Sequence, residues 1–339
     1  MNCSLWIRGE GHTVGVTLLN VEGLVTEFYG EGRTVRAIDH VSFHVDKGEI
    51  LGVIGESGCG KSVTSMSVMR LIPENLGRVA EGRITFEDRN ILKMSRKEFS
   101  GITGKEISMI FQEPLSSLNP LLTCGYQIVE AIRCHEAVSR KKAWKKAVGL
   151  LDMVGIPMPE KRAEEYPHQL SGGMRQRVMI AMAIACSPKL LIADEPTTAL
   201  DVTIQAQILD IIRRLREELG MAVMFITHDM GVIAEVADRV MVMYAGSIVE
   251  EAPVKQFFAN PLHPYSMGLL KAVPRPDEKK ERLFMIEGTV PKLSEEIIGC
   301  RFCGRCGCAA DICTEQKPPL VDAGQGQKVL CWQYAMEGR

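Results

Sequence analysis

The feature that most constrains the fold of this chain is a glycine-rich run between an expected strand and an expected helix. Residues 50–54, Ile-Leu-Gly-Val-Ile, have the composition of a buried strand. The run Gly-Glu-Ser-Gly-Cys-Gly-Lys-Ser follows at 55–62, and the stretch from Lys61 to Leu71 has helical character. In this order the three segments bring several backbone N–H groups and a helix N-terminus to one point, where they can hold an anion. The sequence therefore predicts an α/β fold with a site for a nucleoside triphosphate.

Each residue type in the run suits such a site. Gly55, Gly58 and Gly60 have no side chain that would block the approach of a phosphate. Lys61 can reach the β- and γ-phosphates, and the hydroxyl of Ser62 can ligate Mg²⁺. The alternative, an ordinary glycine-rich turn, is disfavoured by the strand and the helix on either side.

Two adjacent acids end a second run of buried-strand character. The apolar residues 190–193 are followed by Asp194 and Glu195, and adjacent residues of a strand point to opposite faces. Asp194 is the predicted partner of Mg²⁺, and Glu195 is the predicted general base toward an attacking water. Such a pair alone would indicate a solvated strand end, but the glycine loop favours a catalytic role.

Gln112 and His228 also follow expected strands. The neutral amide of Gln112 can contact both Mg²⁺ and the attacking water, and it can sense whether the γ-phosphate is there. His228 can hydrogen-bond that phosphate. Either residue alone would have a structural role, and only the surrounding motifs make them catalytic candidates.

The composition excludes other classes of protein. The 339-residue chain has a formal net charge of −2, whereas a dedicated nucleic-acid binder usually carries a basic surplus. No run of about 18 apolar residues exists, so we expect no membrane-spanning helix. Residues 1–13 lack the apolar core of a signal peptide. We therefore expect a cytoplasmic protein, and any membrane role would come through a partner.

The order of the expected elements indicates one α/β core with an inserted helical part. Short strands are expected over 14–53, and charged helical stretches such as 139–154 follow later. Further elements are expected as a helix at 202–219, a strand at 222–226 and a closing hairpin at 240–249. Prolines at 274–277 mark a boundary. The predicted domains are a core at 14–272, its helical subdomain at about 95–188, and a cysteine-rich C-terminal appendage at 273–339.

A third motif, Leu-Ser-Gly-Gly, lies at 170–173. We expect it not to contact the nucleotide bound by its own chain but to cover a nucleotide bound by a partner. With the other motifs it forms an ordered series: 55–62, Gln112, 170–173, 190–195, 199–201 and His228. In order and approximate spacing this series resembles that of an ABC-transporter ATPase. The motif at 170–173 is the discriminating one, because other P-loop proteins lack it.

The resemblance implies an ABC ATPase cassette and further site residues. The motif at 170–173, at a helix N-terminus, would close on the γ-phosphate held by the opposite subunit. Asp201 would lie in the loop that crosses the dimer interface, and Tyr29, or alternatively Phe28, would stack on adenine. The expected contacts of MgATP are Tyr29, Gly55, Ser57, Gly58, Cys59, Gly60, Lys61, Ser62, Val63, Gln112, Ser171, Gly172, Gly173, Asp194 and Asp201.

Longer runs at 112–120, 166–170, 193–203 and 260–265 resemble the oligopeptide and dipeptide importer branch, which includes nickel uptake systems. This resemblance covers about residues 17–335. It implies an ATPase on the cytoplasmic face of the membrane, with a related second ATPase, two transmembrane permeases and an external binding protein as partners, and no nucleic acid. ATP would close the ATPase pair, and hydrolysis would release it.

Two alternatives to a peptide importer stay open. A nickel importer of the same branch would have an almost identical ATPase, because specificity lies in the other subunits. A soluble ABC ATPase of translation or DNA repair is the alternative from another class. Those proteins usually carry two cassettes or a long coiled coil, and this sequence has neither.

Six of the eleven cysteines lie in the last 40 residues, and in a reducing compartment such clustering favours metal over disulfides. The importer branch has a four-cysteine motif associated in some members with a [4Fe–4S] cluster. It corresponds here to Cys300, Cys306, Cys313 and Cys331. Cys303 and Cys308 depart from that motif and leave open which four would bind. Zinc and free buried thiols are the alternatives.

Overall fold

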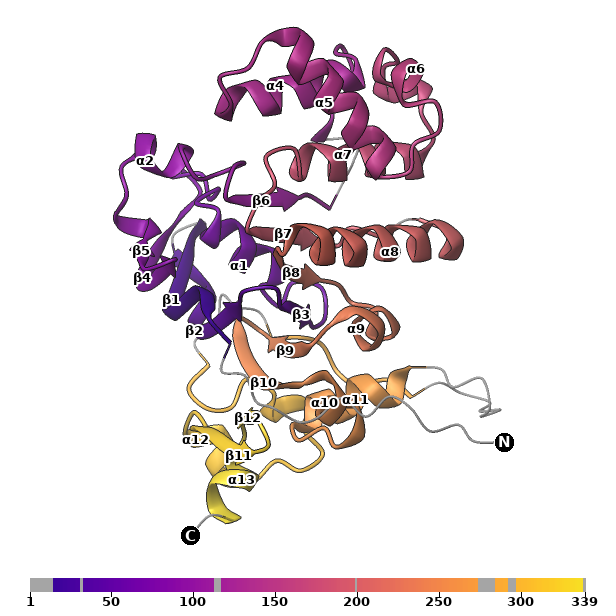
Figure 1. Ribbon diagram of the computed structural model, residues 1–339. Helices are drawn as coiled ribbons and strands as arrows, with labels where there is room; N and C mark the ends of the chain where they lie inside the picture. The colour runs from indigo at the N-terminus through magenta and orange to yellow at the C-terminus, as the bar shows by residue number, and fades with distance from the viewer. Residues whose placement is uncertain are drawn as a thin grey trace, which may run out of the picture.

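The structure, a computed structural model, describes residues 15–30, 33–112, 117–198, 200–273, 284–291 and 297–337. The expectations for the start of the chain, for residues 113–116 and 199, and for the boundary at 274–277 lie outside these ranges. Figure 1 shows strands at the centre, a group of helices above them and the C-terminal region below. Within the described ranges no helix is both long and apolar enough to span a membrane.

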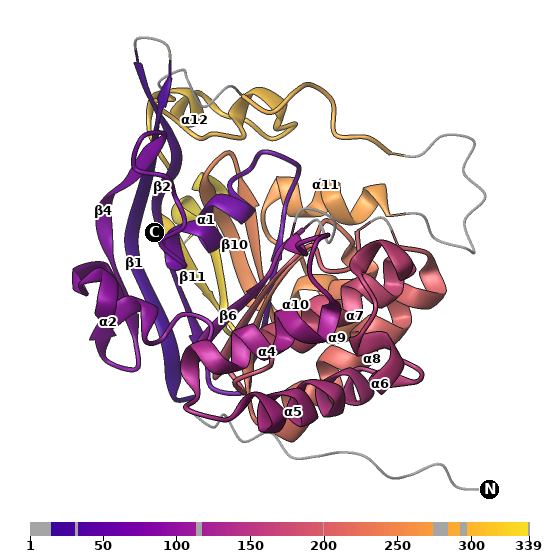
Figure 2. The same cartoon turned by 90° about the horizontal axis from the view of Figure 1, so that it is seen from above.

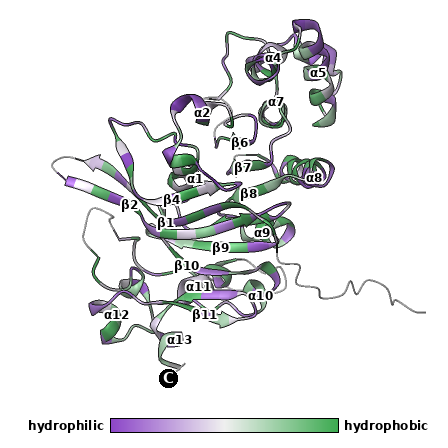
Figure 3. Ribbon diagram, turned by 60° about the vertical axis from the view of Figure 1, so that its left-hand side comes forward, coloured by the Kyte–Doolittle hydropathy of each residue, from purple (hydrophilic) through white to green (hydrophobic). Residues whose placement is uncertain are grey.

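The core of the molecule is an eight-stranded sheet. In spatial order its strands are β11 (Leu320–Gly324), β12 (Gln327–Leu330), β10 (Ser247–Pro253), β9 (Arg239–Tyr244), β3 (Ile50–Ile54), β8 (Ala222–Ile226), β7 (Leu190–Asp194) and β6 (Ile107–Ile110). Neighbours from β9 to β6 are parallel, and the other pairs are antiparallel. All residues of β3, β7 and β8 are buried, as parallel strands require, and Figure 3 shows β9 as largely hydrophobic.

A second, antiparallel sheet forms the N-terminal β subdomain. Its strands in order are β2 (Arg33–Asp46), β1 (Thr17–Gly30), β4 (Gly77–Phe86) and β5 (Arg89–Asn90). β1 and β2 are longer than the short strands expected here, because several bulges let them bend and continue. Gly82 has φ +106, and a Cβ there would lie 2.7 Å from Cα of Leu24, so the close approach of β4 to β1 at this irregularity in their pairing requires glycine. Figure 2 shows this sheet along one side of the molecule.

The inserted helical subdomain consists of α4 (Cys124–His135), α5 (Arg140–Met153), α6 (Pro159–Ala163), the 3-10 turn η2 (Pro167–Gln169) and α7 (Gly172–Ala183). The hydroxyl of Ser139 accepts the N–H of Lys142 and caps α5, so the helix expected at 139–154 is confirmed. Ile128, Leu151 and Val178 are buried in one cluster, which holds these helices together.

The other helices of the described residues flank the sheets. They are α1 (Lys61–Val68), η1 (Ile91–Lys93), α2 (Arg96–Ser100), α8 (Val202–Leu219), α9 (Met230–Val236), α10 (Val254–Ala259), α11 (Pro264–Ala272), η3 (Cys303–Arg305), α12 (Asp311–Glu315) and α13 (Trp332–Glu337). α8 ends at Gly220 in the left-handed conformation, as expected. α1 ends three residues before the expected Leu71, because the backbone turns at Arg70 with φ +50.

The cysteine-rich C-terminal region is joined to the core through the central sheet. β12 pairs with β10, with Val329 opposite Glu250. Val329 packs in a small cluster with Leu262 and Cys331. The hairpin of β11 and β12 therefore extends the sheet that carries the candidate site.

Candidate active site

The sheet topology brings the predicted residues to one edge. β3, β6, β7 and β8 are parallel neighbours, so their carboxyl ends meet at the same side of the sheet. The phosphate loop follows β3, Gln112 follows β6, Asp194 ends β7, and His228 follows β8. The strand ends that the sequence singled out are therefore adjacent in space.

The phosphate loop has a conformation that only its glycines allow. Gly55 has φ +150, and a Cβ there would lie 2.2 Å from the carbonyl oxygen of Met243. The ammonium of Lys61 donates to the carbonyl oxygens of Gly55 and Glu56 at 2.8 and 3.1 Å, so the lysine folds back over the loop. Cys59 is fully buried, and burial raises the pKa of its thiol, which fits a filler and not a nucleophile.

Ser62 and Asp194 form the pair expected to bind Mg²⁺. The Ser62 hydroxyl donates to Oδ1 of Asp194 at 3.1 Å. Asp194 is buried, and burial raises the pKa of its carboxyl, with a smaller contribution in the same direction from the charge of Glu195. A hydroxyl and a carboxylate side by side are hard oxygen ligands, and so this pair fits Mg²⁺.

Glu195 lies at the centre of a separate group of side chains. Its Oε2 accepts from Nε2 of Gln112 at 3.1 Å and from the hydroxyl of Thr198 at 2.9 Å, and its Oε1 lies 3.5 Å from Nδ1 of His228. The backbone of Glu195 has φ +48, which directs its side chain away from the strand that Asp194 ends. The two acids therefore have different partners. Thr198 has no sequence signal and was not predicted.

The motif at 170–173 lies on the helical subdomain, at the start of α7. The Ser171 hydroxyl caps α7, and a Cβ on Gly173 would lie 2.8 Å from Ile204 of α8. Asp201 caps α8 by accepting the N–H of Ile204 at 2.9 Å. Asp201 and the 170–173 motif thus lie on neighbouring helix starts. Within the described chain, no hydrogen bond or ion pair joins 170–173 to the phosphate loop.

The aromatic candidates lie at the end of β1. Tyr29 is 49% exposed, and its N–H donates to the carbonyl oxygen of Leu76 at 2.8 Å. Phe28 is partly buried, with its ring over Gly77. Of the two, Tyr29 is the more available for stacking on a base.

The C-terminal region also contacts the phosphate loop, which no sequence motif indicates. The guanidinium of Arg305 binds both carboxylate oxygens of Glu56, at 2.7 and 3.1 Å. The hydroxyl of Tyr265 accepts the N–H of Glu56 at 2.9 Å. These residues are 249 and 209 positions apart in the sequence, so no local pattern could have indicated the contacts.

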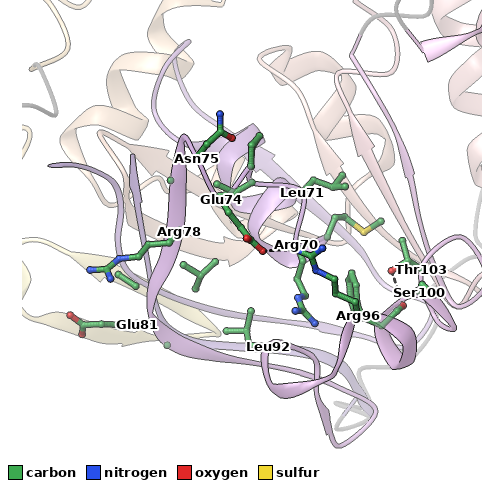
Figure 4. Close-up of a pocket in the computed structure, with 18 residues that line it drawn as sticks. Arg70, Leu71, Glu74, Asn75, Arg78, Glu81, Leu92, Arg96, Ser100 and Thr103 are labelled. Carbon is green, nitrogen blue, oxygen red and sulfur yellow. Dashed lines mark hydrogen bonds and ion pairs between the residues drawn. The ribbon is translucent and has the colours of Figure 1, made fainter. Parts of the chain in front are cut away.

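A broad pocket of about 980 Å³ lies elsewhere, between the end of α1, strand β4 and helix α2 (Figure 4). Its arginines are already engaged. Arg96 pairs with Glu74 at 2.7 Å. Arg70 donates to the carbonyl oxygens of Ile91 and Met94. Of the described residues that line the pocket, none belongs to the predicted nucleotide site.

A smaller cavity of about 70 Å³ lies in the C-terminal region, and one water needs only about 10–15 Å³. Its lining includes six thiols, those of Cys300, Cys303, Cys306, Cys308, Cys313 and Cys331. Burial raises the pKa of Cys300 to about 11. In the described chain, no group of three or more His, Cys, Asp or Glu side chains is placed to hold one metal ion.

A phosphate loop after a central strand, acids at the end of β7 and an inserted helical subdomain define an ATP-binding cassette. Two family profiles agree: ABC transporter matches residues 38–198, and Oligopeptide/dipeptide transporter, C-terminal region, matches 249–313. The chain belongs to the family of ATP-binding subunits of oligopeptide and dipeptide ABC transporters.

Individual relatives match over nearly their whole length. The chain is 52% identical to Probable peptide ABC transporter ATP-binding protein y4tR of Sinorhizobium fredii, over 96% of this chain and 98% of the relative. It is 48% identical to Oligopeptide transport ATP-binding protein AppD of Bacillus subtilis, over 95% and 98%. Among solved structures, the dimeric post-hydrolysis state of the ATP-binding cassette MJ0796, bound to ADP and Pi, has a TM-score of 0.63 and 27% identity, over 70% of this chain and 99% of that chain.

Proposed function

We propose that the chain is the ATP-hydrolysing motor subunit of a membrane importer for dipeptides or oligopeptides. The observation that carries the proposal is the convergence of Lys61, Asp194 and Glu195 at one sheet edge in a chain of this family. The names of the relatives AppD and OppD, both oligopeptide transport ATP-binding proteins, support a peptide cargo. Nickel is the alternative cargo, and a soluble ABC ATPase of translation or DNA repair is the alternative class.

In the proposed site the loop N–H groups and Lys61 bind the phosphates of ATP. Ser62 and Asp194 hold Mg²⁺ together with Gln112. Bound Mg²⁺ supplies positive charge that offsets the charge of the β- and γ-phosphates. Tyr29 stacks on the adenine ring.

The proposed hydrolysis uses the second group of side chains. Glu195 accepts a proton from the attacking water. Gln112 and Thr198 orient its Oε2 by donating hydrogen bonds at 3.1 and 2.9 Å. His228, beside Oε1, hydrogen-bonds the γ-phosphate. Because these side chains contact Glu195, Asp194 remains available as a ligand of Mg²⁺.

The proposed active unit is a pair of cassettes. Ser171, Gly172 and Gly173 of one cassette cover the nucleotide of the other, and Asp201 lies at the interface. Val202, next to Asp201, is 83% exposed in the single chain, as expected of a side chain that a partner covers. The solved neighbours whose names call them dimeric support this arrangement.

The proposed partners are a related second ATPase, two transmembrane permeases and an external binding protein. The chain would lie at the cytoplasmic face of the membrane, with the cassette at 14–272 and the C-terminal appendage at 273–339. Short helices of the permeases would dock beside Gln112 and the helical subdomain. Phe111, Leu121 and Tyr126, which lie near Gln112 in the sequence, are exposed apolar side chains that fit this contact.

Purification of a tagged chain from detergent-solubilised membranes tests the assignment. Mass spectrometry should identify two permeases, a second ATPase and an external binding protein whose bound ligand is a peptide. Recovery of the chain only from the soluble fraction, without permeases, contradicts a transport function. A nickel-loaded binding protein supports the alternative cargo.

We also propose that the C-terminal cavity holds a structural [4Fe–4S] cluster on Cys300, Cys306, Cys313 and Cys331. The six thiols around one cavity support the proposal, and so does the thiolate-only ligation that such clusters accept. Bound as thiolates, the four cysteines would tie η3, α12 and the start of α13 to one point, which stabilises the region without a role in electron transfer.

Anaerobic purification tests the cluster. The wild-type chain should absorb near about 400 nm and contain iron. Cys300→Ser with Cys306→Ser should lose both signals, whereas the matched pair Cys303→Ser with Cys308→Ser should keep them. A wild type with neither absorbance nor iron contradicts the cluster, and zinc in its place supports the other metal.

A further inference from the structure

The cysteine-rich region reaches the phosphate loop through one arginine. Arg305 closes the turn η3, between Cys303 and Cys306 of the thiol-lined cavity. Its guanidinium forms a two-pronged ion pair with Glu56, the second residue of the loop, with N···O distances of 2.7 and 3.1 Å. The Arg305 side chain is 7% exposed, and that of Glu56 is 28% exposed. The guanidinium is therefore shielded from solvent although the carboxylate is partly exposed, and the two-pronged contact fixes the geometry of the pair, unlike an ordinary surface salt bridge.

All five N–H donors of Arg305 are engaged. Besides the two bonds to Glu56, it donates to the carbonyl oxygen of Glu287 at 3.0 Å, to that of Ile286 at 3.2 Å and to the hydroxyl of Tyr244 at 3.4 Å. Its guanidinium also lies 5.8 Å from the centre of the Tyr244 ring. A guanidinium held by five bonds has one orientation, so it can fix the position of the carboxylate it binds.

The rest of the loop is anchored by the same side of the molecule. Tyr265 holds the N–H of Glu56, and its ring packs against Phe302, three residues before Arg305. At the other end of the loop, the N–H of Gly246 donates to the carbonyl oxygen of Cys59 at 2.9 Å. Arg301 binds the carbonyl oxygen of the preceding residue, Ala245. Both ends of the loop thus contact residues that in turn contact the C-terminal region: Tyr265 at one end and Gly246 at the other.

The charge of Glu56 gives a physical reason for this arrangement. A carboxylate within a phosphate-binding loop repels the phosphates that the loop must bind. Arg305 offsets that charge and holds the carboxylate on the side of Tyr244, while the ammonium of Lys61 stays near the loop carbonyls. Without Arg305, the carboxylate of Glu56 would keep a partly buried charge and lose the ion pair that the described residues give it.

We propose that Arg305 is a positioning residue of the ATP site: it acts through Glu56, and it makes ATP binding depend on the folded C-terminal region. The proposal rests on the ATP-binding function. The C-terminal region then takes part in nucleotide binding, although Arg305 is 249 positions from Glu56 in the sequence. The role is positional, because Arg305 contacts Glu56 and not the expected place of the phosphates.

ATP binding by single and double variants tests the proposal in the full chain carrying Glu195→Gln, which keeps the nucleotide intact. Arg305→Ala should raise the Kd of ATP about tenfold. Glu56→Gln should change it less than about threefold, because the amide has the shape of the carboxylate without its charge. The double variant should bind like Glu56→Gln alone, since the arginine acts only through that carboxylate. Arg96→Ala, at an exposed ion pair with Glu74, is the matched control and should bind like wild type.

Hydrolysis by the assembled transporter, with Glu195 restored, adds a second readout. Arg305→Ala should raise KM for ATP and leave kcat within about twofold, because the hydrolytic group around Glu195 is intact. If Arg305→Ala does not fold, Arg305→Lys keeps the charge but loses the two-pronged geometry, and it should show a smaller rise in Kd that Glu56→Gln removes.

Two results overturn the proposal. One is a folded Arg305→Ala chain whose Kd for ATP lies within about twofold of wild type. The other is a double variant as weak as Arg305→Ala alone, which would mean that the arginine does not act through Glu56. A wild-type chain that binds no ATP at all contradicts the proposed function instead, and the two failures are therefore distinguishable.

Discussion

The hydroxyl of Ser62, in the first turn of α1, donates a 3.1 Å hydrogen bond to Oδ1 of Asp194, the last residue of β7. The two residues are 132 positions apart, and they meet because β3 and β7 end at the same edge of the sheet. The Asp194 carboxyl is buried, and burial raises its pKa. A buried carboxyl beside a hydroxyl at a phosphate loop can serve as a ligand for a cation that binds there with the nucleotide.

Asp194→Asn should weaken MgATP binding at least about tenfold, or about 1.4 kcal/mol, because it removes the only charge of this oxygen pair. The same change should leave the nucleotide-free protein as stable as wild type or more stable, because a buried carboxylate costs solvation energy that an amide does not. Titration with a fluorescent ATP analogue, with and without Mg²⁺, measures the first effect, and melting curves measure the second. Unchanged Mg²⁺-dependent affinity contradicts the assignment.

The raised pKa of Asp194 also predicts a pH dependence. A carboxyl whose folded pKa lies above its ordinary value of 3.8 is neutral in the folded chain at a pH where an exposed Asp is charged. Its burial cost is therefore absent below 3.8 and present once the pH exceeds the raised pKa. On acidification, Mg²⁺-dependent ATP affinity should begin to fall before an ordinary Asp would protonate, and Asp194→Asn should abolish that step. A wild-type profile that is flat down to about pH 4 contradicts this expectation.

Glu195→Gln should leave ATP binding intact and lower turnover at least about 100-fold, because the amide cannot accept a proton from water. Thr198→Val, which removes one of the bonds that orient the carboxylate, should lower turnover less. Phosphate release from the assembled transporter measures turnover, and equilibrium binding measures affinity. Near-normal turnover in Glu195→Gln would eliminate Glu195 as the base.

The substitution Gly172→Asp distinguishes ATP binding by a single chain from the closure of two cassettes on the nucleotide. Apart from its chain neighbours and the backbone of its own helix, no described atom lies within 4 Å of a Cβ built at Gly172, so the substitution should not disturb its own chain. Gly173 is unsuitable, because its Cβ would meet Ile204 at 2.8 Å. Gly172→Asp should leave ATP binding by the isolated chain unchanged and lower turnover of the pair at least about tenfold, since it places a negative charge against the partner's nucleotide. Weakened ATP binding by the isolated variant would contradict a role in trans.

The strands of the active-site edge could be predicted from the sequence where a run of apolar residues ends at a motif. The strand expected at 222–226 has those bounds, and the one expected at 190–193 is longer by one residue. Because β7 and β8 are parallel, their carboxyl ends meet at the same edge of the sheet, and Asp194 and His228 fall there.

Contacts across long separations could not be predicted. The pairing of Arg305 with Glu56 depends on how β12 joins β10, and no periodicity in the chain specifies that edge pairing. Thr198 donates to Glu195 where the backbone of Glu195 turns with φ +48. A non-glycine residue in that conformation carries no sequence signal.

The mass in solution of the Glu195→Gln chain mixed with its partner ATPase, measured by analytical ultracentrifugation with and without MgATP, tests whether two cassettes share the nucleotide. The two chains should be separate without nucleotide and should form a pair with MgATP. Lys61→Ala should prevent the pair from forming. Chains that stay separate at saturating MgATP, with binding of ATP confirmed, would contradict a nucleotide held between the phosphate loop of one cassette and the 170–173 motif of the other.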